Sequence, residues 1–188
     1  MQNYDLVLLV DPSLSEVNRK EVIAELEALI KKIIINQDDI GLQQLMYDLW
    51  SKTWNDKAYV YSYHIEAKAE DLDIIKKHLL YNNAIKRYHV FKINKNEDFL
   101  IFSKTSDELN KIIEEWDPKK LWQKVKFFSD KKNAKYLNRK SVVMLKKYIT
   151  RFGNIKPRAY TNNSVSTQKK LKNTILRARE LGLVAYKK

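Results

Sequence analysis

The first part of the chain alternates between apolar runs of strand character and apolar residues at helical spacing. A near-continuous apolar run from Tyr4 to Val10 is typical of a central strand, and Asp11-Pro12 ends it. Ser13 and Glu16 have the spacing of a capping box, which predicts that a helix begins there. The apolar residues of this helix are expected on one face, at Val22, Leu26, Leu29 and Ile33.

The same alternation continues as far as residue 93. A second strand is expected over Ile40–Leu49, with partial alternation of apolar residues, and a polar hairpin loop over residues 50–57. A third strand is predicted over Ala58–Ile65, because tyrosines occupy every second position and would share one face, at Tyr59, Tyr61 and Tyr63. These segments therefore continue the chain as two neighbouring strands.

A second helix and a fourth strand complete this pattern. The helix is predicted over Glu70–Tyr81, with its aligned apolar residues at Leu72, Ile75 and Leu79, and Asn82-Asn83 ends it. The last strand is expected over Ile85–Ile93. The order β-α-β-β-α-β predicts an α+β, ferredoxin-like domain over residues 1–94, in which two helices cover one face of an antiparallel sheet. This fold by itself implies no function.

Residues 95–124 have the pattern of a connector that contains a short helix. Thr105 and Glu108 repeat the capping-box spacing, and Asp117-Pro118 would end the helix. Its apolar stripe is formed by Leu109, Ile112, Ile113 and Trp116. We expect this helix to cover hydrophobic surface on one of the flanking domains.

Residues 125–188 are predicted to form a small, mostly helical domain. A helix near Lys140–Arg151 is expected to end at Gly153, and an extended stretch over Asn154–Thr161 follows, because the residue before a proline disfavours helix. Ser164 is a suitable N-cap for a last helix that runs to about Leu181, with Gly182 as its C-terminal stop.

The last helix is predicted to have one apolar and one cationic side. Successive residues turn by about 100°, which places Leu171, Ile175 and Ala178 within one arc. The basic residues are expected across the opposite arc, at Lys169, Lys170, Lys172, Arg177 and Arg179. Glu180 is the sole acid of this segment, whereas a helix that is merely exposed usually mixes both signs of charge. This pattern favours contact with a polyanion.

Charge is divided unevenly along the chain. Residues 1–100 hold 13 basic and 16 acidic residues, whereas residues 124–188 hold 19 basic and 2 acidic residues. Such a basic block would repel itself unless a polyanion neutralised it, and its apolar periodicity indicates a folded surface instead of a tail. Nucleic acid is favoured over a membrane, because no stretch approaches the ~20 apolar residues of a membrane span.

An enzyme is not expected. The sequence contains no cysteine, which excludes disulfides, thiolate metal sites and cysteine nucleophiles. Its three histidines, His64, His78 and His89, have no ligand spacing, and only three glycines are present where a phosphate-cradling loop needs several. We therefore expect no catalytic residues, no metal, no cofactor and no small-molecule substrate.

The segment from Asn154 to Tyr186, with Lys140–Gly153 before it, resembles the family of small-subunit ribosomal protein eighteen. The likeness runs without gaps through Pro157-Arg158, Thr161, residues 168–171, Arg177-Ala178-Arg179 and residues 181–183. Ala159 replaces a usual arginine and Ala185 a common proline. Some relatives carry metal-binding cysteines near the position of Lys126–Ser129, where this chain has none.

Residues 1–93 resemble a second family, small-subunit ribosomal protein six. The likeness rests on Tyr4–Glu16, on Gly41, Leu45 and Tyr47, and on Ala84–Ile93. Arg87 matches a basic residue of that family. Its usual arginines and proline are absent from the second strand, where this chain has Gln43, Gln44 and Asp48.

The two resemblances together imply a fusion of two proteins that pair on the central domain of small-subunit rRNA. The chain would be a structural constituent of the small subunit, with rRNA, neighbouring ribosomal proteins and its own second domain as partners. The expected RNA contacts are Arg87, Arg151, Lys156, Arg158, Lys169, Lys170, Lys172, Arg177 and Arg179.

Two points stay open from the sequence. A non-ribosomal protein of the RNA-recognition-motif type shares the β-α-β-β-α-β order, and Tyr59 and Tyr61 stand where its third-strand aromatics would be. The ribosome of origin is the second point. The Lys, Asn, Ile and Tyr richness and the departures at Gln43, Gln44 and Asp48 slightly favour a mitochondrial over a bacterial ribosome.

Overall fold

The computed structural model describes residues 1–47, 56–93, 99–115 and 127–186. The chain divides into two compact units, Met1–Phe99 and Leu100–Lys188. No helix in these described segments is long and apolar enough to cross a membrane.

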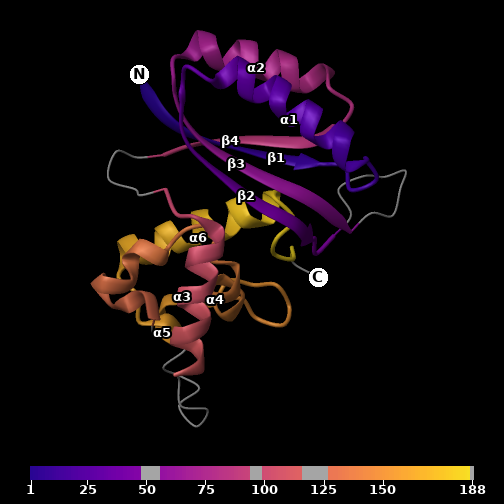
Figure 1. Cartoon of the computed structure of the whole chain (residues 1–188). Helices are drawn as coiled ribbons and strands as arrows, with labels where there is room; N and C mark the ends of the chain where they lie inside the picture. The colour runs from indigo at the N-terminus through magenta and orange to yellow at the C-terminus, as the bar shows by residue number, and fades with distance from the viewer. Residues whose placement is uncertain (48–55, 94–98, 116–126, 187–188) are drawn as a thin grey trace. The chain divides into compact units, whose positions relative to one another are not determined.

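The first unit is a four-stranded antiparallel sheet with two helices on one face (Figure 1). The strands lie in the order β2-β3-β1-β4, so β2 and β4 are the edges. In chain order the elements are β1 (Gln2–Val10), α1 (Glu16–Ile30), β2 (Ile34–Gln44), β3 (Lys57–Ala67), α2 (Ala69–Tyr81) and β4 (Ile85–Lys92). The predicted β-α-β-β-α-β order and ferredoxin-like arrangement are confirmed.

The core of this unit lies between the sheet and the two helices. Alternate residues of β1 point into it, at Leu6, Leu8 and Val10. The three tyrosines of β3 share that face, as predicted, and Tyr63 donates its hydroxyl to Glu27 Oε1 at 3.0 Å. The other residues of β1 and β3 therefore form the opposite face of the sheet.

The helix α1 begins and packs differently from the prediction. Its N-cap is Ser15, whose side chain accepts from Asn18 N, whereas Ser13 bonds to Asp11. The buried residues of α1 are Ile23, Leu26 and Ile30. Leu29 is instead exposed, and Ile33 lies beyond the helix end. The prediction is confirmed at Leu26, and Val22 and Ile33 pack against the same core. It was wrong at Leu29, because a neighbouring apolar stripe with Ile23 and Ile30 is buried in its place.

Strand β2 lies about six residues earlier in the chain than predicted. It spans Ile34–Gln44 instead of Ile40–Leu49 and contains the polar run Asn36–Asp39. An edge strand pairs on one side only and tolerates such a run. The expected hairpin loop falls mostly on residues 48–55, outside the described residues.

The helix α2 agrees with its prediction. It buries Leu72, Ile75 and Leu79 and ends at the C-cap Asn82. Strand β3 is longer than predicted, by one residue at its start and two at its end. Strand β4 ends one residue earlier than predicted.

The second unit is helical. Its elements are α3 (Phe102–Glu114), η2 (Phe127–Ser129), η3 (Lys131–Tyr136), α4 (Val142–Lys147), α5 (Arg158–Thr161) and α6 (Val165–Glu180). The helix α4 is shorter than predicted, and α5 replaces the end of the predicted extended stretch.

The helix expected within the connector is α3, and it belongs to the second unit. Thr105 is not its cap but lies inside the helix, where its hydroxyl donates to the carbonyl oxygen of Ile101 at 2.7 Å. Leu109 is fully buried, and Glu108 accepts from the Tyr136 hydroxyl at 2.7 Å. The helix α3 ends at Glu114, with Glu115 as its C-cap, whereas the predicted stop at Asp117-Pro118 lies outside the described residues.

Candidate nucleic-acid interface

The helix α6 carries five of the predicted RNA contacts. Ser164 caps it as predicted, accepting a hydrogen bond from Thr167 N at 3.1 Å, and Gly182 ends it with a φ of 75°. Leu171, Ile175 and Ala178 are fully buried on one side. The predicted apolar face of this helix is confirmed.

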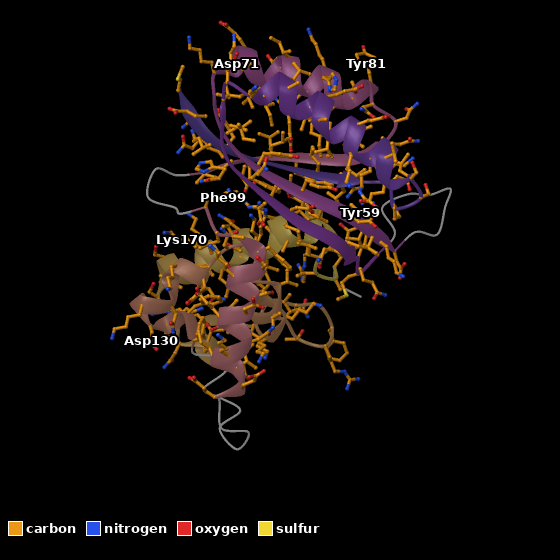
Figure 2. All side chains as sticks on the ribbon, in the orientation of Figure 1. Tyr59, Asp71, Tyr81, Phe99, Asp130 and Lys170 are labelled. Atoms are coloured by element: carbon orange, nitrogen blue, oxygen red, sulfur yellow. The ribbon has the colours of Figure 1, made fainter. Side chains whose placement is uncertain are left out.

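Three of its lysines form an exposed cationic side. Lys169, Lys170 and Lys172 are all exposed, and Lys170 is labelled in Figure 2. We call these three residues the lysine triad. Because the buried side fixes the rotation of α6, the triad is held toward solvent, where phosphate groups could approach it.

Arg179 does not lie on this exposed side. It is 7% exposed, and its Nε donates to the carbonyl oxygen of Ala185 at 3.0 Å. A second guanidinium nitrogen donates to the carbonyl oxygen of Gly153. The prediction of an outward Arg179 was wrong, because a position four residues after Ile175 is only about 40° away from it on the helix.

Arg177 and Arg158 are more accessible. Arg177 is half-buried on α6, and Arg158 is exposed at the start of α5. The Nε of Arg158 donates to the carbonyl oxygen of Asn163 at 3.0 Å, which holds its side chain beside the start of α6. The two other guanidinium nitrogens of Arg158 also carry N–H donors, which can bind further acceptors.

A glutamine organises the connection between α5 and α6. The Gln168 side chain donates to the carbonyl oxygen of Lys156 at 2.9 Å and accepts from Thr161 and Asn163 at 3.0 and 3.1 Å. Lys156 is half-buried. These bonds fix the backbone that carries Lys156 and Arg158, so both cations extend from an ordered segment.

The two remaining predicted contacts lie elsewhere. Arg151 is exposed in the turn that precedes the isolated bridge residue Ile155. Arg87 is half-buried on β4 in the first unit, paired with Leu9 on the face of the sheet away from the helices. The structure thus brings together the predicted contacts of α5 and α6, and places Arg87 in a different unit.

An aromatic cluster supports the basic unit from inside. Phe128 lies 5.0 Å from Tyr148 and 5.3 Å from Phe127, measured between ring centroids. The Tyr148 hydroxyl accepts from Phe128 N at 3.0 Å. Burial raises the pKa of Tyr148 to about 12. This cluster gives the strongly basic segment a folded core.

Among the described residues, no metal site accompanies the predicted RNA contacts. The described segments contain no group of three His, Cys, Asp or Glu side chains that could hold a metal ion. A cavity of about 430 Å³ lies beside α1, lined among others by Arg19, Glu27, Asp39 and Tyr61. None of its lining residues is a predicted RNA contact.

Two family models match the chain over separate segments. Residues 133–184 match ribosomal protein S18, and residues 3–92 match ribosomal protein S6. The small ribosomal subunit protein bS18 of Mycoplasma capricolum is 44% identical over 64 residues, which is 34% of this chain and 84% of that protein. The chain belongs to the ribosomal protein S18 family. With its S6 segment, it is an S6–S18 fusion and a small-subunit ribosomal protein.

Other similar proteins come from further bacteria. The bS18 protein of Mesoplasma florum is 41% identical over 64 residues, covering 34% of this chain and 83% of that protein. A crystal structure of 30S ribosomal protein S6 from Thermotoga maritima has a TM-score of 0.44 at 13% identity, covering 59% of this chain and 97% of that one. Ribosomal protein families are structural, so the prediction that the chain is not an enzyme is confirmed.

The two units are named the S6 unit and the S18 unit, after the family that each matches. The S18 unit also exposes basic residues that were not predicted as contacts. Lys132 and Lys135 on η3 and Lys146 on α4 are exposed. Lys135 Nζ lies 4.7 Å from the centroid of the Tyr136 ring, and a hydrogen bond with Tyr136 raises the pKa of Lys135. The density of lysines over residues 131–147 was the available signal.

Proposed function

We propose that this S6–S18 fusion binds the central domain of small-subunit rRNA through its S18 unit. The observation that carries the proposal is the lysine triad, which α6 exposes opposite a fully buried apolar side. Such an arrangement neutralises phosphates from an ordered surface and releases their counterions. Arg158, Lys156 and Arg177 add cations from the neighbouring segment.

A titration of the full chain with a central-domain rRNA fragment tests this proposal. Affinity should fall steeply with salt. Replacing the lysine triad by Gln should weaken binding and remove about three phosphate contacts, which makes the salt slope shallower by about two to three units. The matched control replaces three exposed lysines of the first unit, Lys31, Lys32 and Lys77, by Gln. Equal effects of both triple variants, or equal affinity for an unrelated RNA of the same length, would contradict the proposal.

The RNA-recognition-motif alternative loses its main support. That class of protein stacks bases on aromatic side chains of its sheet. Here Tyr59 and Tyr61 pack against the core between sheet and helices, and the Arg19 guanidinium lies 3.6 Å from the Tyr59 ring centroid. These tyrosines therefore stabilise the first unit and are not available as a stacking surface.

We also propose that the S6 and S18 units pair within one chain. The face of the sheet away from α1 and α2 has an apolar centre, formed by Val7 and Leu9 on β1 and by Val60 on β3, which pairs with Leu9. An apolar face of this kind favours burial against a partner. Fusion would supply that partner at an effective concentration on the order of millimolar.

Cleavage of the full chain between the units tests the pairing. A protease site introduced within residues 94–98 would leave two fragments, which should co-elute at micromolar concentration if the units pair. Fragments that separate at that concentration would overturn the proposal. Neighbouring small-subunit proteins are further expected partners, and a small-molecule substrate is not expected.

The chain is placed in the small ribosomal subunit, and its relatives in this comparison are bacterial. The slight preference for a mitochondrial ribosome stays a prediction that rests on composition and on Gln43, Gln44 and Asp48. The rRNA that co-purifies with the chain from its own cells decides between the two.

A further inference from the structure

A tight turn at residues 150–153 presents two adjacent side chains at its tip. Gly153 N donates to the carbonyl oxygen of Thr150 at 2.9 Å, and Thr150 N donates to that of Asn154 at 2.8 Å. An isolated antiparallel bridge between Ile149 and Ile155, the residues that flank this segment, closes the turn. The two central residues are Arg151 and Phe152, and both are exposed.

The ring of Phe152 contributes little to folding at this position. It is 59% exposed, so most of the ~1.5–3 kcal/mol that burial of such a side chain provides is not gained. The centres of turns usually hold Gly, Asn, Asp or Ser, which suit the backbone there. A single exposed aromatic is nevertheless ordinary on a protein surface, so exposure by itself assigns no role.

Two further features distinguish this ring. The guanidinium carbon of Arg151 lies 4.9 Å from the centroid of the Phe152 ring, so a cation accompanies the aromatic face. The carbonyl oxygen of Gly153 accepts from the buried guanidinium of Arg179, which anchors the turn to α6. The aromatic ring and the cation are therefore held on an anchored turn of the basic unit.

We propose that Arg151 and Phe152 form a stacking platform for an unpaired base of the bound RNA, an inference that rests on the proposed RNA binding. Bases stack on aromatic rings and on guanidinium planes, and they do so when loops or bulges expose their faces. A base within a continuous duplex has no free face to offer. The platform thus selects single-stranded nucleotides, whereas the lysine triad contacts phosphates of any RNA.

Substitutions in the full chain test the platform. Phe152→Leu keeps the apolar volume but removes the flat ring, and should weaken binding to the central-domain fragment by roughly fivefold or more with the salt dependence unchanged. Phe152→Tyr should bind like the parent chain. Arg151→Gln should weaken binding and reduce the salt slope by about one contact. The matched control is Tyr81→Leu on α2 (Figure 2). This change removes an aromatic side chain that is 81% exposed and should leave RNA binding unchanged.

The outcomes separate the platform from the proposed function. If the parent chain binds RNA with a steep salt dependence and Phe152→Leu binds equally well, the platform is wrong and the proposed function stands. If the parent chain does not prefer the central-domain fragment, the proposed function itself fails. An equal loss on a continuous RNA duplex, or a loss only of incorporation into the small subunit, would overturn base stacking in favour of a backbone or protein contact.

Discussion

Arg179 Nε donates a hydrogen bond of 3.0 Å to the carbonyl oxygen of Ala185, six residues further along the chain. The same guanidinium also donates to the carbonyl oxygen of Gly153. A buried cation needs such partners because burial removes its water. Arg179 therefore joins the segment after α6 to the turn before α5, and acts by positioning the basic surface.

Replacing Arg179 by Ala should destabilise the chain. Loss of hydrogen bonds from a charged donor, with two carbonyl groups left behind, should lower the free energy of unfolding by about 2–3 kcal/mol. For a unit of this size, the melting temperature should fall on the order of 10 °C. Calorimetry or urea unfolding measures this change.

Lys172→Ala on the same helix is the control for Arg179→Ala. Lys172 is exposed, so its substitution should change the unfolding free energy by less than about 0.5 kcal/mol. Amide hydrogen exchange at residues 183–185 should accelerate in Arg179→Ala and not in Lys172→Ala. A stable Arg179→Ala variant with a reduced salt slope in RNA binding would instead make Arg179 a phosphate contact.

The wrong prediction for Arg179 shows which side-chain positions helical periodicity determines and which it does not. The positions of Leu171, Ile175 and Ala178 were predictable because buried apolar residues repeat with the helix. Arg179 lies at the margin of that arc, where a long side chain can turn either to water or to nearby carbonyls. The choice depends on where Gly153 and Ala185 come to lie, which is a property of the tertiary fold.

Ser164→Ala should destabilise α6 by about 1 kcal/mol. The Ser164 hydroxyl accepts from Thr167 N and lies 2.8 Å from the Thr167 hydroxyl, so its loss leaves a helix-start N–H without this acceptor. Ser166→Ala, two residues further on, removes an exposed hydroxyl and should change stability by no more than a few tenths of a kcal/mol. Urea unfolding of both variants compares them, and equal effects would contradict the capping role.

Tyr148 should make stability depend on alkaline pH. Its pKa is about 12 in the folded chain against an ordinary value of 10.0, because burial disfavours the phenolate. The stabilisation is fully present below pH ~10, where the group is neutral in both states, and is lost as pH rises toward 12. The loss should reach roughly 2 kcal/mol at pH 12.

Tyr148→Phe isolates this contribution. At pH 9 the variant should be less stable by about 1–3 kcal/mol, because Phe128 N loses its acceptor. Between pH 10 and 12 the difference from the parent chain should shrink, since the variant has no phenol to ionise. Urea unfolding at several pH values measures the unfolding free energy of the parent chain and of the variant. If the two free energies changed with pH in parallel, burial would not raise the pKa of Tyr148.

The first unit shows the same division between predictable and unpredictable features. The helix α2 has a single apolar stripe, and its buried residues Leu72, Ile75 and Leu79 were therefore identified from spacing. The helix α1 has two adjacent stripes, so the choice between Leu29 and Ile30 required the sheet. The predicted range of the edge strand β2 was shifted along the chain, because its polar residues Asn36–Asp39 have no alternating pattern.

The boundary between the two units gives the last prediction. A fragment of residues 100–188 should fold cooperatively, whereas residues 125–188 should not, although both contain the whole S18 match. The reason is α3, which supplies the buried Leu109, and whose Glu108 accepts from the Tyr136 hydroxyl at 2.7 Å. Just before α3, the carbonyl oxygen of Leu100 accepts from Lys140 Nζ at 2.7 Å, so removal of this segment would leave a buried ammonium without that acceptor.

Thermal unfolding followed by circular dichroism should show a single sharp transition for residues 100–188 and a broad one for residues 125–188. Hydrogen exchange should show strong amide protection in the longer fragment and weak protection in the shorter one. Within the longer fragment, Leu109→Ala should cost about 2–5 kcal/mol, as expected for a fully buried leucine. The exposed Ile101 offers the control, because Ile101→Ala should cost far less. If residues 125–188 unfolded as sharply as residues 100–188, α3 would be a connector between the S6 and S18 units and not part of the S18 fold. Its apolar stripe would then require a partner elsewhere in the small subunit.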